Sequence, residues 1–415
     1  MPQRALSRLL LSLVLGHWPL AISALAADWP QWRGPNRDGF TAETLPASFA
    51  TAPKQLWQVP VGHGYAGPVV AGNRLLLIAE AAGQETAHWL DTATGQVLWA
   101  VAVGETFADE FEPGPRCVPV LDGDRAYTQS CRGEFRCLNL KDGSTRWRFH
   151  FRDYGATWSE EKSGGVGAAN RRGNSGSPVI LGDRVLVQIG SVDGASLAAF
   201  DKLTGKLLWK TANDLTTYSS PVVGKLAGRT QFVSATCEGL LSVTPEDGRE
   251  LWRLPFKTYA NRNVLTPIIA DDTVYFASHS TGFRAVKVTR DGDGLRASDA
   301  WLNRDLKLNL STPVLVRGHL YGLGPAKNYV CLDAVTGTVR WSQPGFDAVA
   351  STVTDGQRLL VTNDKGEVLL LAANPERFEE LGRFQATGKT FSHPALADGV
   401  FYLRDSRVLT AYRLP

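Results

Sequence analysis

Short apolar runs rich in valine, leucine and isoleucine alternate with turn residues along the chain from about residue 54 to its end. Many of these runs follow a small or polar residue and a proline, as in Gly176–Ile180 (GSPVI) and Ser219–Val223 (SSPVV). The same order recurs at 66–70, 265–269, 311–315 and 392–396. Behind most of them, a Gly or Asp turn leads into a second apolar run, such as Arg184–Gln188. Short runs bounded by turn residues are typical of strands, so the pattern predicts an all-β protein.

A second register follows these paired runs and has the form small-x-Asp-x-x-x-Gly-x-x-x-Trp. In Ala199–Trp209 (AFDKLTGKLLW), the glycine comes four residues after the aspartate and four before the tryptophan. The copies, in which Asn or Thr can replace the aspartate, are Trp89/Asp91/Gly95/Trp99, Cys137/Asn139/Gly143/Trp147, Ala199/Asp201/Gly205/Trp209, Ser242/Thr244/Gly248/Trp252 and Cys331/Asp333/Gly337/Trp341. The two patterns together predict a repeated unit of four short strands joined by turns.

The aromatic residue that ends each unit gives the length of the repeat. These residues are Trp57, Trp99, Trp147, Trp209, Trp252, Trp301, Trp341 and Phe384. They follow one another at 40 to 62 residues, which brackets the ~40–45 residues of a four-stranded propeller blade. After Phe384 the chain has only three predicted strands left, at 391–396, 400–404 and 408–412. The predicted strand Lys54–Val59 carries the unit-ending Trp57 but has no other strands of its unit before it. We therefore predict an eight-bladed β-propeller of four-stranded antiparallel blades over residues 54–415, closed by an N-terminal strand that completes the C-terminal blade.

Turn chemistry and packing explain the repeated residues without catalysis. An aspartate at the start of the turn can accept local backbone N–H groups, and glycine can take a positive φ. The tryptophan offers a large flat surface for packing between blades, so we interpret the blade-end tryptophans as structural. Cys137 and Cys331 occupy the small-residue position and are expected to lie in the core. A disulfide within the set Cys117, Cys131 and Cys137 remains open.

Composition and charge exclude several classes of function. The chain has 41 Gly, 12 Trp and a single Met, which suits a turn-rich β protein. It carries 44 Lys and Arg against 41 Asp and Glu without a clustered basic stretch, so we expect no nucleic-acid partner. His-x-x-x-His and Gly-x-Ser-x-Gly spacings do not occur, and we assign no catalytic or metal-binding residue.

The N-terminus has the features of a secretory signal. Arg4 and Arg8 precede the apolar run Leu9–Leu15, and Ala24–Ala26 supplies small residues for cleavage before Ala27. No cysteine stands at the cleavage point to carry a lipid, and no later stretch is apolar enough to span a membrane. We expect residues 1–26 to be a signal peptide and the mature protein to be a periplasmic or secreted monomer without a membrane span.

The Asp-x-x-Thr-Gly-x-x-x-Trp register resembles the tryptophan-docking motif of pyrroloquinoline-quinone (PQQ) repeat proteins. These are eight-bladed propellers of the quinoprotein alcohol dehydrogenase-like superfamily, and the resemblance covers about residues 28 to 415. The segment Asp28–Gly39 (DWPQWRGPNRDG) is similar to the leader of secreted bacterial members. We expect residues 27–53, rich in Trp, Pro and Gly, to pack on the propeller in a structural role.

The resemblance implies two kinds of relative. Catalytic members use PQQ and a calcium ion held by carboxylate and amide ligands, and many have a disulfide between adjacent cysteines. This chain has no Cys-Cys pair, and no calcium-ligand set can be matched residue by residue. It looks more like secreted non-catalytic members and the propeller scaffold of the outer-membrane assembly machinery, so we expect no cofactor. A PQQ- and calcium-dependent oxidoreductase is the alternative, and a carbohydrate-directed binding or processing role is the second.

Loops that precede the inner strands share one face of a propeller with the loops between the second and third strands, and function is often carried by such loops. Binding of an envelope or extracellular protein, or of a small ligand, is expected there. The candidate residues, whose types suit an anionic or carbonyl-rich ligand, are His63, Tyr65, Arg116, Asn174, Tyr218, Arg262, Asn263, Asn309, Lys327 and His393. The long step between Trp147 and Trp209 holds an insertion at 151–174, which we interpret as a lid or partner-binding loop with Arg171 and Arg172 near the rim.

Overall fold

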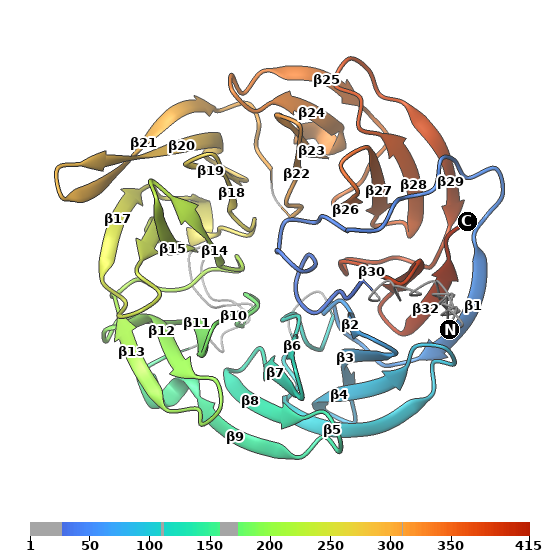
Figure 1. Cartoon of the computed structure of the whole chain (residues 1–415), viewed down its shortest axis with the longest axis horizontal. Helices are drawn as coiled ribbons and strands as arrows, with labels where there is room; N and C mark the ends of the chain where they lie inside the picture. Colours follow the sequence, from blue (N-terminus) through green and yellow to red (C-terminus); the bar gives the residue numbers. More distant parts are fainter. Residues whose placement is uncertain (1–26, 109–111, 158–172, 309) are drawn as a thin grey trace, which may run out of the picture.

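Eight four-stranded antiparallel sheets surround a central axis as the blades of a propeller (Figure 1). The structure is a computed structural model, and it describes residues 27–108, 112–157, 173–308 and 310–415. The first strand of each of the first seven blades lies nearest the axis and the fourth lies at the rim (Figure 1). The predicted all-β, eight-bladed architecture is confirmed. Within the described ranges, the helical elements are three short 3₁₀ turns, η1 (Phe151–Tyr154), η2 (Tyr259–Asn261) and η3 (Pro325–Lys327).

The blades follow one another in chain order, and within each blade the strands are named from the axis outward. Blades one to four are formed by β2 (Val69–Ala71), β3 (Arg74–Ala81), β4 (Gln84–Asp91) and β5 (Val97–Glu105); β6 (Val120–Asp122), β7 (Arg125–Gln129), β8 (Glu134–Asn139) and β9 (Thr145–His150); β10 (Val179–Leu181), β11 (Arg184–Ser191), β12 (Ala195–Asp201) and β13 (Leu207–Thr211); β14 (Val222–Leu226), β15 (Arg229–Thr236), β16 (Gly239–Val243) and β17 (Glu250–Pro255). Blades five to eight are formed by β18 (Ile268–Ala270), β19 (Thr273–Ser278), β20 (Gly282–Asp291) and β21 (Gly294–Asn303); β22 (Val314–Val316), β23 (His319–Leu323), β24 (Tyr329–Asp333) and β25 (Val339–Gln343); β26 (Ala350–Thr354), β27 (Arg358–Asn363), β28 (Glu367–Ala372) and β29 (Glu380–Gln385); β30 (Ala395–Ala397), β31 (Val400–Arg404), β32 (Val408–Arg413) and β1 (Lys54–Pro60).

The ring closes through its eighth blade. Strand β1 pairs antiparallel with β32, with Trp57 opposite Ala411. The N-terminal strand therefore supplies the outer strand of the C-terminal blade, as predicted. This pairing leaves no open edge between the first and last blades.

The blade-end tryptophans join each blade to the next. All seven lie on outer strands, and six of them donate a hydrogen bond from the indole nitrogen to a main-chain carbonyl of the following blade. The pairs are Trp57 with Thr92, Trp99 with Leu140, Trp147 with Lys202, Trp209 with Pro245, Trp301 with Ala334 and Trp341 with Asn374. Trp252 differs, because its nitrogen donates to Gln231 of its own blade at 2.6 Å. In the following blade, the long β20–β21 hairpin replaces the repeated Asp-x-x-x-Gly turn.

In five of the joints, a turn glycine of the following blade lies against the tryptophan ring; these glycines are Gly95, Gly143, Gly205, Gly248 and Gly337. Asp201 accepts the backbone N–H groups of Leu203 and Thr204, as expected of a turn cap. Gly205 has a φ of 73°, and a Cβ there would come within 2.7 Å of the Trp147 ring. Glycine is therefore required both by the backbone conformation and by the close approach of the indole.

The cysteines are core residues. All five are buried, and no disulfide joins any of them. Cys137 and Cys331 are fully buried, as expected for the small-residue position. The Cys117 thiol donates to the carbonyl of Asn174 at 3.0 Å, so the disulfide that the sequence left open is not formed.

The segment that precedes β1 crosses the middle of the ring (Figure 1, dark blue). Residues 29–40, which we call the leader, contact inner strands, or the residues just before them, in seven of the eight blades. The contacts are Trp29 with Val70, Pro30 with Leu121, Arg37 with Pro178, Trp32 with Thr266, Arg33 with Pro313, Phe40 with Thr354, and both Trp29 and Trp32 with His393. Trp29 and Arg33 are each 1% exposed, so the leader fills the channel.

Beyond the leader, the chain runs outward over blades seven and eight. The Leu45 N–H donates to Asp355 and the Gly399 N–H donates to Glu43. Asp355 and Gly399 lie in turns between first and second strands, which all reach the same face of a propeller. The chain therefore lies on that face at blades seven and eight, whereas the loops before the inner strands surround the opposite end of the channel.

Candidate functional site

A cavity of about 330 Å³ lies at this opposite end of the channel. Each of the eight blades contributes a residue from the segment before its inner strand, and the leader contributes Trp32. The lining residues are Trp32, Tyr65, Arg116, Ser175, Ser177, Tyr218, Ser220, Arg262, Val264, Thr266, Leu310, Thr312, Val349 and Phe391. The cavity thus combines two cations, several hydroxyl groups and an apolar wall, and no carboxylate belongs to this described lining.

Four of the hydroxyl residues occupy one repeated position, directly before the proline that leads into an inner strand. They are Ser177, Ser220, Thr266 and Thr312. Ser220 Oγ accepts the N–H of Ser177 at 3.0 Å, and Thr312 Oγ1 accepts the N–H of Thr266 at 2.9 Å. Ser177 Oγ in turn accepts the N–H of Val118 at 3.0 Å. These side chains tie neighbouring blades together, so the repeat itself fixes their positions around the mouth.

Aromatic rings form the wall on the side of blades eight and one. Tyr65 and Phe391 meet edge to face with their centroids 5.6 Å apart. The Arg116 guanidinium lies over Tyr65 at 5.6 Å and over Phe107 at 5.0 Å. A cation held against ring faces keeps its charge while its apolar surroundings exclude water.

Trp32 is the leader's contribution to the cavity. Its indole nitrogen donates to Thr266 Oγ1 at 2.9 Å, and its ring lies 5.1 Å from that of His393. His393 is also stacked on Trp29 at 6.2 Å. Burial, and secondarily the charge of Arg33, lowers the pKa of His393 to about 3. The imidazole is therefore neutral near pH 7 and acts as packing next to Trp32.

Two further leader cations lie in the channel. Arg33 and Arg37 are 1% and 5% exposed. Arg33 donates to Pro313 O at 2.7 Å, and Arg37 donates to Pro178 O at 2.8 Å and to Ser177 O at 3.0 Å. Burial lowers the pKa of Arg33 to about 10 and that of Arg37 to about 9, and both remain charged near pH 7. Nε and Nη1 of Arg33 and Nε of Arg37 have no hydrogen-bond partner among the described residues.

A buried carboxyl group lies near Arg116. Glu85 is fully buried, and the N–H of Cys131 donates to its Oε2 at 3.3 Å. Burial raises the pKa of Glu85 to about 8, although the Cys131 hydrogen bonds and the charge of Arg116 act in the opposite direction. Glu85 is therefore mostly protonated near pH 7 and adds little negative charge near the cavity.

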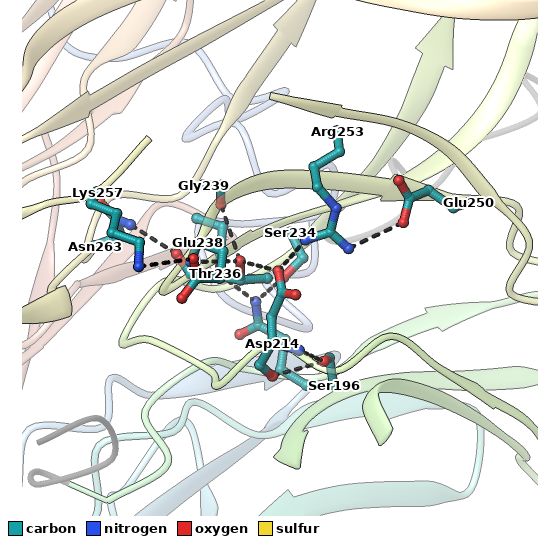
Figure 2. A network of polar contacts seen from close by, with 12 residues as sticks. Ser196, Asp214, Ser234, Thr236, Glu238, Gly239, Glu250, Arg253, Lys257 and Asn263 are labelled. Carbon is teal, nitrogen blue, oxygen red and sulfur yellow. Dashed lines mark hydrogen bonds and ion pairs between the residues drawn. The ribbon is translucent and has the colours of Figure 1, made fainter. Parts of the chain in front are cut away.

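A polar network connects the rim of blade four with the channel face (Figure 2). Asp214 accepts hydrogen bonds from Arg253 at 2.5 Å and from the Thr236 hydroxyl at 2.6 Å. The Asn263 amide donates to Thr236 O at 2.9 Å, and Asn263 O accepts the N–H of Tyr218 at 3.1 Å. Because Tyr218 lines the cavity and Asn263 directly follows Arg262, this network positions two cavity residues.

Four of the sequence candidates meet at the cavity, namely Tyr65, Arg116, Tyr218 and Arg262. The other described candidates do not line it, for different reasons. His63 faces Glu112, with its Nδ1 3.6 Å from a carboxylate oxygen, and Lys327 pairs with Asp347 at 3.0 Å. Asn174, Asn263 and His393 are 2%, 0% and 7% exposed and are enclosed by neighbouring loops.

The remaining candidates, Arg171, Arg172 and Asn309, lie outside the described residues, as does most of the insertion at 151–174. The signal segment 1–26 lies outside them as well. Across the part of the chain that the structure describes, no group of His, Cys, Asp or Glu side chains is arranged to hold a metal ion. No helix within the same ranges is long and apolar enough to cross a membrane.

Sequence reasoning missed Trp32 and the four pre-proline hydroxyls as lining residues. The hydroxyls recur at one position of the repeat, directly before a proline, and that register was the available signal. The place of Trp32 carries no such signal, because the leader is not repeated. Its position depends on contacts with blades more than 200 residues away, such as the bond to Thr266.

The sequence matches a family model described as outer membrane protein assembly factor BamB, over residues 47–157 and 90–343. No curated protein sequence is similar enough to count as a match. Among solved structures, BamB from Moraxella catarrhalis is similar with a TM-score of 0.59 and 15% identity, over 87% of this chain and 100% of that chain. Quinohemoprotein alcohol dehydrogenase from Comamonas testosteroni is similar with a TM-score of 0.66 and 12% identity, over 94% of this chain and 80% of that chain. At these identities the likeness shows the shared propeller fold.

Proposed function

The chain belongs to the family described as outer membrane protein assembly factor BamB, and from this premise we propose that it is a non-catalytic binding or scaffold module of the cell envelope. The module is secreted or periplasmic, and it binds a protein or small ligand through the cavity at the channel mouth. This proposal extends the family's description to a specific surface of this chain.

The observation that carries the proposal is the construction of the cavity. All eight blades and the leader contribute to its lining, so one concave site collects side chains from the whole ring. Cavities that combine apolar walls with a few convergent polar groups are the usual form of ligand sites. Leu310, which is 40% exposed, also lines the cavity and places an apolar contact where a partner can reach it.

The competing function is that of a PQQ- and calcium-dependent oxidoreductase. The rings of Trp32 and Tyr65 and the charges of Arg116 and Arg262 would suit a planar acidic quinone. Calcium prefers carboxylate and carbonyl oxygens, and no carboxylate belongs to the described lining. The residues therefore fit the organic part of the cofactor better than its metal, and we derive no reaction through it.

Site-specific cross-linking tests the binding proposal. A photoreactive amino acid at Leu310 reports on the cavity, whereas one at Val335, which is 81% exposed in a turn between β24 and β25, reports on the opposite face. In intact envelopes we expect discrete cross-linked products from position 310 and none of the same size from position 335. Identical products from both positions, or no product from position 310, would contradict the proposal.

A titration with PQQ and calcium separates the two functions. A ligand that binds only the folded protein raises its melting temperature by mass action. We expect no calcium-dependent rise in melting temperature and no alcohol-dependent reduction of a dye. A calcium-dependent rise together with dye reduction would favour the oxidoreductase.

A further inference from the structure

We propose that the channel mouth is an oxyanion site, in which the hydroxyl groups of Ser177, Ser220, Thr266 and Thr312 receive a phosphate, sulfate or carboxylate group of an organic ligand. We call these four residues the hydroxyl arc. The inference rests on the proposed function, because it names the chemistry of the ligand that the same cavity takes.

The hydrogen bonds of the hydroxyl arc leave the donor of every hydroxyl group unused. A hydroxyl group can accept hydrogen bonds and donate one. Each of the four oxygens already accepts an N–H group, from Val118, Ser177, Trp32 or Thr266. Within the described ranges, none of the four hydroxyl groups donates a hydrogen bond. Their hydrogens are therefore available to an acceptor in the cavity.

Burial makes these donors selective. Ser177, Ser220 and Thr266 are 1%, 5% and 2% exposed, so water reaches them mainly through the cavity that they line. Buried donors without acceptors are costly to leave unsatisfied. An oxyanion presents several acceptor oxygens at once, and hydrogen bonds to a charged acceptor are the strong ones. A neutral ligand would offer weaker acceptors to the same donors.

The charge behind the hydroxyl arc also favours an anion. Arg37 donates to the carbonyl of Ser177, and Arg33 donates to the carbonyl of Pro313, directly after Thr312. Asp38 is the carboxylate that acts on Arg33, whereas the charge that acts on Arg37 is the like charge of Arg33. Within the described ranges, the two buried cations thus have one nearby carboxylate. An anion in the cavity would offset the remaining positive charge.

The rest of the lining describes the body of the ligand. Arg262 lines the cavity beside the hydroxyl arc, while Tyr65 and Phe391 form the aromatic wall across from it. A ligand with the oxyanion at one end and an aromatic or apolar body at the other would contact both sides. The site therefore fits an amphipathic organic anion better than a free inorganic ion.

Calorimetric titration of the purified protein tests this inference. The probes are inorganic phosphate, inorganic sulfate and benzoate for the oxyanion, 4-nitrophenyl phosphate for the complete ligand, and 4-nitrobenzyl alcohol and maltose as neutral compounds. We expect 4-nitrophenyl phosphate to bind more tightly than inorganic phosphate, and the neutral compounds to bind most weakly. Comparison of phosphate, sulfate and benzoate tells a tetrahedral anion from a carboxylate.

Substitutions in the hydroxyl arc provide the decisive comparison. Ser220→Ala and Thr312→Val each remove one hydroxyl, and each should weaken 4-nitrophenyl phosphate binding about tenfold, as expected for a hydrogen bond to a charged group. Ser311→Ala is the matched control, because Ser311 Oγ accepts the N–H of Ala350 at 2.8 Å without lining the cavity. The control should lose a similar interblade hydrogen bond and keep its affinity.

Three outcomes would overturn the inference. They are equal losses of affinity in Ser220→Ala and Ser311→Ala, neutral probes that bind as tightly as the anions, and no binding of any anion. If Thr312→Val does not fold, the comparison of Ser220→Ala with Ser311→Ala decides alone. Cross-linking from Leu310 would still test the proposed function, so failure of the oxyanion site is distinguishable from failure of the binding module.

Discussion

The rim and the axis of the propeller are held together in opposite ways. At the rim, a joint between a tryptophan and a turn glycine recurs in five of the eight blade pairs, as Trp147 with Gly205 shows, and Asp201 caps that turn. At the axis, the channel is filled by a segment that occurs once, with Trp32 and Arg33 contacting blades far away in the sequence. The repeated chemistry builds the ring, whereas the unrepeated chemistry gives its centre a specific shape and charge. A function confined to the centre can therefore vary without altering the joints of the ring.

The largest effect is expected from adding a methyl group to a rim joint. In Gly248→Ala, the new Cβ would lie 2.5 Å from the Trp209 ring at a φ of 73°. Strain of a left-handed alanine, about 1 kcal/mol, adds to an overpacking cost of about 1–3 kcal/mol. We expect chemical denaturation to show a loss of about 3 kcal/mol in the free energy of unfolding.

Gly83→Ala separates the two contributions to this loss. Gly83 also has a positive φ, of 78°, but nothing lies within 4 Å of a Cβ at that position. The variant should lose only the strain of about 1 kcal/mol. Equal losses in the two variants would show that the close approach of the Trp209 ring adds no cost to the substitution.

The same contrast explains how far sequence could lead. The eight blades and their closure could be predicted, because the register from Asp201 to Trp209 recurs and each copy forms the same local turn. The central channel could not be predicted in this way. Trp32 and Arg33 follow no repeat, and their environment is set by loops such as 265–267 and 312–313.

The candidate site shows an intermediate case. Tyr218 and Arg262 could be selected because they precede inner strands, and they do line the cavity. The same rule selected Asn174 and Asn263, which are enclosed by neighbouring loops. Position in the repeat fixes the loop to which a residue belongs. Whether its side chain faces the cavity depends on the packing of adjacent blades, which a single sequence does not encode in any periodic way.

Titration of Glu85 should produce the next largest effect on the free energy of unfolding. Glu85 lies at the channel face, so its effect depends on pH, whereas the rim joints depend on packing. Its pKa is raised to about 8, so the folded state holds the proton more tightly than the unfolded state, whose ordinary pKa is 4.5. The stabilisation is complete below pH 4.5 and is lost as the pH rises towards 8. Between the two pKa values the loss is about 1.4 kcal/mol per pH unit.

Glu85→Gln tests this pH dependence. The amide keeps the shape of the protonated carboxyl group but does not titrate. Urea denaturation at pH 5 and pH 7 should show that the wild-type protein loses about 2–3 kcal/mol more than the variant. Parallel pH profiles for the two proteins would mean that Glu85 is ionised without cost in the folded state.

Asp214 connects the two regions, and its loss should have a smaller effect. Asp214→Asn removes the charge that pairs with Arg253 and accepts from Thr236. The ion pair is partly exposed at Arg253, so we expect a loss of about 2 kcal/mol in unfolding free energy, below the range for fully buried pairs. Glu250 is the other partner of Arg253, and the Glu250 side chain is 47% exposed. Glu250→Gln should therefore have a much smaller effect. Similar losses in both variants would contradict the role assigned to burial.

The smallest effect is expected at a single rim tryptophan. Trp341→Phe keeps an aromatic ring on β25 but removes the indole N–H that donates to Asn374 O at 2.8 Å. Between blades seven and eight, Phe384 already occupies the equivalent position and packs on Tyr412. A phenyl ring is therefore compatible with the interface between blades. Loss of one hydrogen bond should therefore cost about 1 kcal/mol, measured by denaturation. A loss as large as that of Gly248→Ala would mean that the nitrogen, and not the packing of the ring against Tyr329 and Phe378, dominates this joint.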